Sequence, residues 1–146
     1  MSGKDGSKPL PPGQRTIDRI LRWYVDHPGI TRTPPRIDIK TWQLTVDGLV
    51  GNPLKLSWEE FLKLPRVERI SDFHCVEGWS VRNCRWEGIQ FRTLVETSEP
   101  MEGAKYVWFE CADGYATSLR DEELLGDDVL LAYRLNGGVF SLELGG

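Results

Sequence analysis

The residues with the clearest potential for chemistry gather around one cysteine near the middle of the chain. Cys75 lies between His74 and the turn-forming run Gly78-Trp79-Ser80, in a sequence of 146 residues with three cysteines and two histidines. A cysteine thiolate is both a nucleophile and a soft metal ligand. Because bulky and turn-forming residues surround Cys75, we expect its thiol to be held at the end of a strand. The pattern indicates a site that presents a single sulfur atom.

Two familiar uses of cysteine are less well supported and stay open as alternatives. A zinc site needs about four closely spaced N, O or S ligands, whereas Cys75, Cys84 and Cys111 are scattered. Neighbouring His74 and Cys75 would also point to opposite faces of a strand. A cysteine hydrolase needs a histidine base within reach of the sulfur. His27 could supply it, but no Asn or Asp context singles it out. The simplest interpretation of any one of these cysteines is a small buried hydrophobic residue.

The composition excludes several other classes. A net charge of −4 and a pI of about 5.2 do not provide the basic surface that a nucleic-acid binder needs. No apolar run approaches the ~18 residues of a membrane helix, and no glycine-rich phosphate loop occurs. The first thirteen residues lack the apolar core of a signal peptide, so we expect a cytoplasmic protein. Six tryptophans favour a core or pocket walled by large flat side chains.

The elements that must position Cys75 are short strands interrupted by short helices. We expect residues 1–15 to form a disordered tail and residues 16–146 a single domain. A helix is predicted from Thr16, since Ile17, Ile20, Leu21 and Tyr24 form an apolar stripe. Ser57 and Glu60 predict a capping box that opens a second helix, over 57–64, whose register would turn Phe61, Leu62 and Leu64 inward. Asp113-Gly114 and Asn136-Gly137 predict hairpin turns.

Further helices are predicted over 92–96 and 121–125, and strands over 41–49, 54–56, 67–74, 88–91, 105–111, 115–119, 129–135 and 139–144. This order indicates an α+β domain with a mostly antiparallel sheet.

Beyond these patterns, the segment around Cys75 resembles a known family. Asp72-Phe-His-Cys-Val-Glu-Gly-Trp-Ser80, followed by Arg85-Trp-Glu-Gly88, is similar to the cysteine segment of the molybdopterin-binding domain of the sulfite oxidase family. Four more segments resemble family landmarks in family order: Trp42-x-Leu-x-Val-x-Gly48, Leu56-Ser-Trp-Glu-Glu-Phe-Leu-x-Leu-Pro65, Asp113-Gly-Tyr-x-x-Ser-Leu119 and Leu131-Ala…Leu135-Asn-Gly137. The resemblance covers about residues 37–138.

The resemblance implies a fold, a cofactor and a reaction. The fold would be of the sulfite oxidase type, and the cofactor would be molybdenum–molybdopterin, with Cys75 as the thiolate ligand of the metal. Cys111 would lie near the metal centre, and Tyr24 or its neighbours would contact the pterin. The implied reaction moves an oxygen atom to or from a small substrate such as sulfite or an S-oxide. No haem or flavin motif occurs in the sequence, so the electron-transfer partner would be a separate protein.

The resemblance breaks off near the last residues. Family members continue with a Gly-Gly-Pro-x-Arg-Leu run and a lysine-rich loop that bind the pterin and its phosphate, whereas this sequence stops at Gly145-Gly146. We therefore expect the C-terminal part of the family fold to be missing. An alternative function is a cofactor-free structural or interaction domain that keeps only the fold. The strand predicted over 139–144 would then be an exposed edge, from which we expect self-association.

Overall fold

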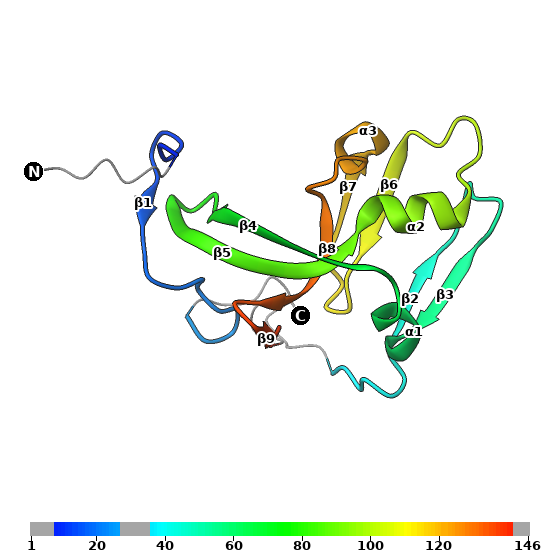
Figure 1. Cartoon of the computed structure of the whole chain (residues 1–146), viewed down its shortest axis with the longest axis horizontal. Helices are drawn as coiled ribbons and strands as arrows, with labels where there is room; N and C mark the ends of the chain where they lie inside the picture. Colours follow the sequence, from blue (N-terminus) through cyan, green and yellow to red (C-terminus); the bar gives the residue numbers. More distant parts are fainter. Residues whose placement is uncertain (1–7, 27–35, 142–146) are drawn as a thin grey trace, which may run out of the picture.

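A long antiparallel strand pair runs across the molecule and carries the other elements. The computed structural model describes residues 8–26 and 36–141. Strand β4 (Arg66–His74) pairs with β5 (Trp79–Gln90), which stretches across Figure 1. The opposite edge of β5 pairs with β8 (Leu130–Leu135), and β9 (Gly138–Val139) extends that side. Near its beginning, β5 also pairs in parallel with β1 (Arg15–Thr16).

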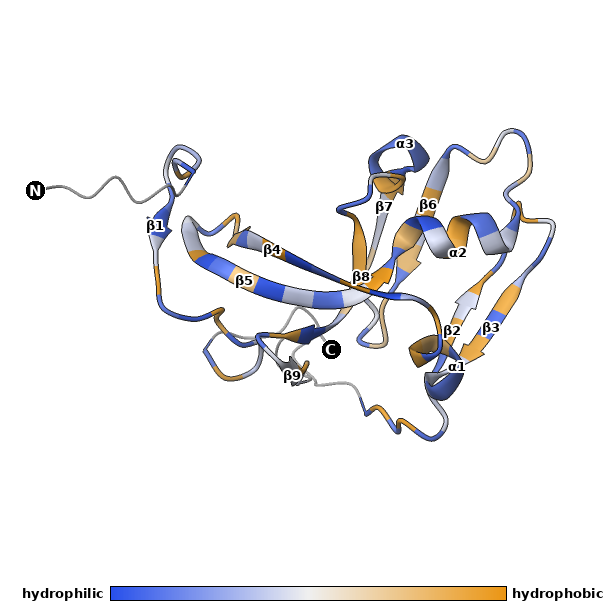
Figure 2. Cartoon of the chain, viewed as in Figure 1, coloured by the Kyte–Doolittle hydropathy of each residue, from blue (hydrophilic) through white to orange (hydrophobic). Residues whose placement is uncertain are grey.

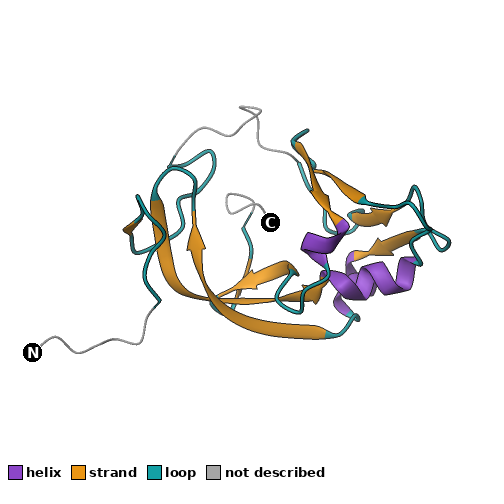
Figure 3. Ribbon diagram, turned by 90° about the horizontal axis from the view of Figure 1, so that it is seen from above, coloured by secondary structure: helices purple, strands orange, loops and turns teal. Residues whose placement is uncertain are grey.

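Two small hairpins and three short helices complete the described chain. The first hairpin joins β2 (Gln43–Val46) to β3 (Leu54–Ser57), and the second joins β6 (Tyr106–Glu110) to β7 (Ala116–Arg120). The helices are α1 (Trp58–Leu62), α2 (Phe91–Ser98) and α3 (Asp121–Leu124). Seen from above, the helices lie at one end of the molecule, away from β1 and the turn between β4 and β5 (Figure 3). The predicted α+β class with mostly antiparallel pairing is confirmed.

Local sequence signals account for several boundaries. The predicted capping box is present at α1: the Ser57 hydroxyl accepts from the Glu60 backbone N–H at 3.2 Å, and the Ser57 N–H donates to the Glu60 carboxylate at 2.8 Å. Asn136 and Gly137 turn β8 into β9 with φ angles of 50° and 86°. That left-handed pair is typical of a tight hairpin turn. Along α2, hydrophobic and hydrophilic residues alternate around the helix (Figure 2), and its buried face holds Phe91 and Leu94.

Two hydrophobic clusters of the described residues lie along β5. The first surrounds α1, where Phe61 and Ile89 are buried and Trp42 meets Trp58 edge to face at 5.4 Å between ring centroids. The second lies around the beginning of β5, where Trp79, Val81 and Cys84 are buried; the partly buried residues packed on it are Ile17, Ile20, Leu21, Phe73, Cys75, Trp86 and Leu135. The tryptophan-rich core expected from the composition is therefore divided between a structural cluster and the neighbourhood of Cys75.

The helix predicted from Thr16 is wrong. Residues 15–16 form β1 instead, because the backbone N–H groups of Arg15 and Ile17 donate to the carbonyls of Gly78 and Ser80, each at 2.9 Å. This long-range pairing satisfies the backbone without a helix. Residues 8–15 also contact the domain, whereas the sequence assigned them to a disordered tail. Residues 1–7, 27–35 and 142–146, which include His27 and the end of the predicted last strand, lie outside the described residues.

Two smaller expectations also differ. Leu62, predicted to face inward from α1, is 41% exposed because the helix ends there and only Phe61 is buried from it. Trp79 and Ser80, predicted to lie in a turn, begin β5 and are almost fully buried. None of the helices in the described ranges is long and apolar enough to cross a membrane.

The close approach of β5 and β8 at Gly88 leads to a stability prediction. A Cβ atom at Gly88 would stand 2.2 Å from the Leu131 carbonyl oxygen and 2.7 Å from the Ala132 Cα, both backbone atoms of β8. Gly88→Ala should therefore push the strands apart and lower the free energy of unfolding by about 1–3 kcal/mol, measured by chemical denaturation. The matched control is Gly138→Ala, whose Cβ meets only the Leu135 oxygen at 3.8 Å. Equal effects at both glycines would contradict this account.

Candidate functional site

A tight turn at the end of β4 holds Cys75. The Cys75 N–H donates to the Trp79 carbonyl at 2.9 Å, and the Gly78 N–H donates back to the Cys75 carbonyl at 3.0 Å. Gly78 has φ of 93°, in the left-handed region that side chains rarely adopt. A Cβ atom there would also stand 3.3 Å from the Gly13 carbonyl oxygen. Glycine is therefore needed at position 78 both to close the turn and to admit the N-terminal segment.

A chain of hydrogen bonds supports this turn from one side. His74 Nδ1 lies 2.7 Å from Ser80 Oγ, and Ser80 Oγ donates to Gln14 Oε1 at 2.9 Å. Gln14 Nε2 then donates to the Cys75 carbonyl at 3.1 Å. Ser80 is fully buried, so its hydroxyl depends on these partners. The side chains of β4, β5 and the N-terminal segment thus meet at the backbone of Cys75.

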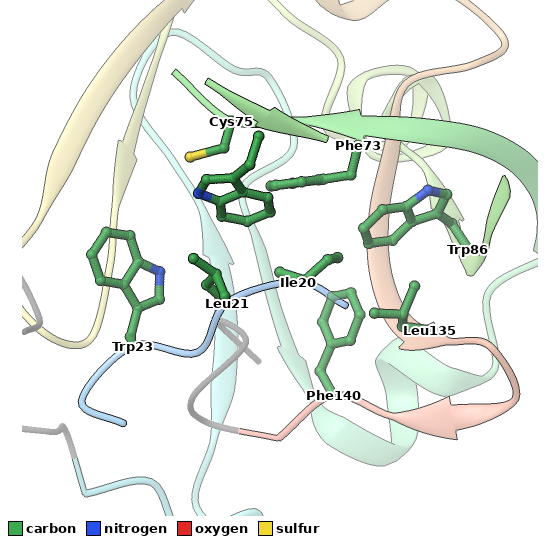
Figure 4. Close-up of a pocket in the computed structure, with 9 residues that line it drawn as sticks. Ile20, Leu21, Trp23, Phe73, Cys75, Trp86, Leu135 and Phe140 are labelled. Carbon is green, nitrogen blue, oxygen red and sulfur yellow. The ribbon is translucent and has the colours of Figure 1, made fainter. Parts of the chain in front are cut away.

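Cys75 lines a cavity of about 230 Å³ that is walled mainly by aromatic and aliphatic side chains. Figure 4 shows Phe73 and Cys75 entering from one side, while Ile20, Leu21 and Trp23 of the N-terminal segment face them from the other. The remaining walls are Trp79, Trp86, Leu135 and Phe140. No lysine or arginine belongs to this lining among the described residues. The cavity therefore offers one sulfur atom in mainly apolar surroundings.

Two polar groups lie close to the cavity, the Trp79 indole N–H and the Glu77 carboxylate. Trp79 Nε1 is buried and has no hydrogen-bond partner among the described residues, although Trp79 itself is only 3% exposed. A buried donor without a partner is costly, which favours a ligand that would accept from it. At the turn, Cys75 Sγ lies 3.9 Å from Glu77 Oε1. The Glu77 carboxylate is therefore the acidic group placed beside the thiol.

Of the other predicted site residues, none is among those lining the described cavity. Tyr24 follows the lining residue Trp23 and has a left-handed φ of 63°. Cys111 directly follows β6 and is exposed as a residue, although partial desolvation of its sulfur and then the charge of Asp113 raise the pKa of its thiol. The roles of Tyr24 and Cys111 stay predictions. Cys84 is 1% exposed, and burial raises the pKa of its thiol, as expected for a structural cysteine.

No group of three or more His, Cys, Asp or Glu side chains suited to hold a metal ion occurs among the described residues. The structure therefore gives the zinc alternative no support within those ranges. Sequence reasoning missed Gln14, Trp79 and the cavity wall formed by Ile20 and Leu21. The only sequence signal for the wall was the apolar spacing that we interpreted as a helix.

Comparison with known proteins identifies the family. A sequence model of the oxidoreductase molybdopterin binding domain matches residues 31–146. The chain belongs to this family. The family resemblance seen in the Cys75 segment is thereby confirmed, and the protein is a molybdopterin-binding oxidoreductase domain.

The chain spans only part of the length of the curated relatives that it matches. The uncharacterized oxidoreductase YuiH of Bacillus subtilis is 35% identical over 141 residues, covering 97% of this chain and 69% of YuiH. The putative protein-methionine-sulfoxide reductase subunit YedZ1 of Azospira oryzae is 37% identical over 57% of this chain and 31% of its own length. The protein-methionine-sulfoxide reductase catalytic subunit MsrP of Campylobacter jejuni is 41% identical over 48% of this chain and 23% of its own length.

A solved structure confirms the fold. The sulfane dehydrogenase SoxCD from Paracoccus pantotrophus superimposes with a TM-score of 0.68 at 21% sequence identity. The match covers 77% of this chain and 33% of that one. The identity is low, so the likeness supports the sulfite oxidase-type architecture and carries no conclusion about substrate.

The described residues fit the metal end of a molybdenum–molybdopterin cofactor. A thiolate is a soft ligand that suits a metal already bound by dithiolene sulfurs, and Cys75 lines a mainly apolar cavity that is also lined by Trp79, whose buried N–H has no partner among the described residues. The cavity volume of about 230 Å³ is below the range of ~300–1,000 Å³ that ligand sites usually span. The described cavity therefore suits the reactive end of the cofactor, and its lining does not include the cations that a phosphate group would require.

A carboxylate on β4, close to the cysteine turn, gives a pH prediction. The backbone N–H of Asn83 donates to Asp72 Oδ1 at 2.9 Å, and Arg82 lies 3.1 Å from the other oxygen. The Asn83 hydrogen bond, together with the charge of Arg82, holds the pKa of Asp72 below its ordinary value. Because the folded pKa is depressed, the stabilisation is present above the unfolded pKa of about 3.9 and is lost as pH falls through the folded pKa.

The free energy of unfolding of Asp72→Asn should therefore fall less than that of the wild type as the pH is lowered below about 4. Unfolding free energies measured between neutral and acidic pH check this expectation. Asp47→Asn, which removes an exposed carboxylate far from these partners in sequence, is the control. The same acid dependence in the wild type and both variants would show that Asp72 is not linked to folding.

Proposed function

We propose that Cys75 is the protein ligand of molybdenum and that this domain catalyses oxygen-atom transfer at the sulfur of an S-oxide. The observation that supports the first part is the placement of the Cys75 sulfur in an apolar cavity, in a chain that belongs to a molybdopterin-binding family. When bound, the molybdenum cofactor supplies two-electron redox chemistry coupled to movement of an oxygen atom. The remaining steps are assigned to this chain's own residues.

The character of the cavity favours an S-oxide over a small inorganic oxyanion. A bare anion such as sulfite needs charge-assisted hydrogen bonds, whereas no lysine or arginine lines the cavity within the described ranges. Sulfur atoms make favourable contacts with aromatic rings, and Trp23, Phe73 and Trp86 provide such rings. The names of MsrP and YedZ1, protein-methionine-sulfoxide reductases, agree with an organic sulfur substrate.

The cysteine must lose its proton before it can act as a ligand. Metals bind the thiolate rather than the thiol, and metal coordination itself favours deprotonation. The Glu77 carboxylate, whose Oε1 lies 3.9 Å from Cys75 Sγ, is the acceptor we assign for that proton. The aromatic walls surround the sulfur with apolar surface, and the turn held by Gly78 fixes its direction.

We also propose that electrons reach the site through a separate partner. The sequence carries no haem or flavin motif, and two relatives are named as subunits of a reductase. The substrate, the electron partner and the cytoplasmic location expected from the sequence are proposals for the whole protein, because this chain spans only part of its relatives.

Removing the thiol tests the ligand assignment. Cys75→Ser keeps the size of the side chain but replaces the soft sulfur with a harder oxygen. We expect protein expressed in a cofactor-competent host to lose most of its bound molybdenum on this substitution, measured by elemental analysis. Cys111→Ser, on an exposed cysteine outside the cavity lining, should retain the metal. A wild-type protein without molybdenum would instead support the cofactor-free interaction domain.

The outer edge of β9 supports a proposal about self-association. Among the described strands, β9 pairs only with β8, and Val139 is 64% exposed. An unpaired strand edge can accept another chain, so we expect dimers or larger assemblies at high protein concentration, measured by light scattering. Val139→Lys should weaken association, since a charged edge residue disfavours pairing. Tyr106→Lys, on the exposed face of β6, is the control; a clean wild-type monomer would contradict the proposal.

A further inference from the structure

We infer that Gln14 is a positioning residue for Cys75, acting through the carbonyl group of the cysteine turn. Hydrogen bonds, more than packing, hold the tip of this turn. Val76 is 100% exposed, and Glu77 is also exposed. Packing therefore does not fix the tip, and its geometry depends on hydrogen bonds. Two of the hydrogen bonds among the described residues are internal to the turn, one runs from the Arg15 N–H to the Gly78 carbonyl, and one comes from the Gln14 side chain.

The direction of each hydrogen bond follows from the number of available protons. Ser80 has a single hydroxyl proton, which it donates to Gln14 Oε1. It can therefore only accept from His74, so Nδ1 of His74 carries the proton in their 2.7 Å contact. Gln14 has its amide nitrogen left to donate to the Cys75 carbonyl at 3.1 Å. All donors point one way, from His74 to the cysteine backbone, and bonds aligned in this manner strengthen one another.

Backbone pairing delivers Gln14 to this place. The next residue, Arg15, donates from its N–H to the Gly78 carbonyl, and Ile17 donates to the Ser80 carbonyl. On the other side of Gln14, the Gly13 carbonyl approaches Gly78 so closely that a Cβ atom there would lie at 3.3 Å. The Gln14 side chain is therefore fixed between the turn and the first residues of β5.

The same segment also forms the wall opposite the sulfur. Ile20, Leu21 and Trp23 follow Gln14 within ten residues and line the cavity that Cys75 enters. The hydrogen bonds between Gln14 and the turn thus set the position of the thiol and hold the segment that faces it. The proposed role is to orient Cys75 toward the cavity, and it extends the proposed function because that orientation is the one required for metal binding.

The test compares two glutamines that make the same kind of bond. Gln14→Met removes the donor to Cys75 without adding charge. Gln90→Met is the matched control, because Gln90 Nε2 donates to the Asp127 carbonyl at 3.0 Å, away from the cysteine turn. The readout is the alkylation rate of each cysteine by iodoacetamide in the metal-free protein, resolved by mass spectrometry. Cys84, at 1% exposure, reports global unfolding, and exposed Cys111 reports general reactivity.

We expect Gln14→Met to raise the Cys75 rate about fivefold, the change in open population that the loss of one ordinary hydrogen bond implies. The rates of Cys84 and Cys111 should stay unchanged, and Gln90→Met should alter none of them. If Gln14→Met does not fold, Ser80→Ala breaks the chain one step earlier and should raise the Cys75 rate in the same direction.

The alkylation rates and the metal content together decide between the positioning role of Gln14 and the ligand role of Cys75. An unchanged Cys75 rate in both variants, or equal changes in Gln14→Met and Gln90→Met, would overturn the positioning role. In cofactor-loaded protein, Gln14→Met should also shift the thiolate-to-metal absorption band that Cys75→Ser abolishes. If Cys75→Ser keeps its molybdenum while Gln14→Met still raises the Cys75 rate, the ligand proposal fails and the role of Gln14 in holding the turn stands.

Discussion

The antiparallel pairing of β4 and β5 is the constraint on which the rest of the structure depends. Its register places His74 opposite Ser80 and leaves Cys75 to Gly78 as the connecting turn. The same β5 strand pairs with β8 and β1, so a shift of register by one residue would move the cysteine turn and reverse which side chains face the interior. The bulge between Ser71 and Phe73 locally adjusts this pairing just before Cys75.

The structural cluster around α1 and the candidate site around Cys75 lie at different ends of the β4–β5 pair. Around α1, Phe61, Ile89 and Tyr133 form a cluster without unpaired buried donors among the described side chains. Around Cys75, a similar set of aromatic rings leaves a cavity open, and the Trp79 N–H has no partner within the described ranges. A protein interior normally fills such voids and pairs such donors. One exception lies beside the sulfur that the family resemblance assigns to a metal, where a bound cofactor would fill the void and accept from the donor. The other buried donor without a hydrogen bond among the described side chains, Arg134 Nε, lies 3.4 Å from the Glu87 carboxylate.

Local signals in the sequence predicted most of the fold, and long-range contacts explain what they missed. The capping box at Ser57, the Asn136-Gly137 turn and the β6–β7 hairpin each involve residues close in sequence, and all are confirmed. The segment from Thr16 carries apolar residues at helical spacing, but its backbone pairs with residues more than sixty positions away. For the same reason the contact from Gln14 to Cys75 could not be predicted. The choice of Cys75 itself came from family resemblance rather than from spacing.

The central claim is that the Cys75 sulfur binds molybdenum in the loaded protein. X-ray absorption at the molybdenum edge measures the number of sulfur neighbours directly. We expect the molybdenum in the wild-type protein to have one more sulfur neighbour than the molybdenum in the small fraction of Cys75→Ser protein that retains cofactor. Equal sulfur coordination in the two proteins would contradict it and would show that the metal, if held, is held without this cysteine.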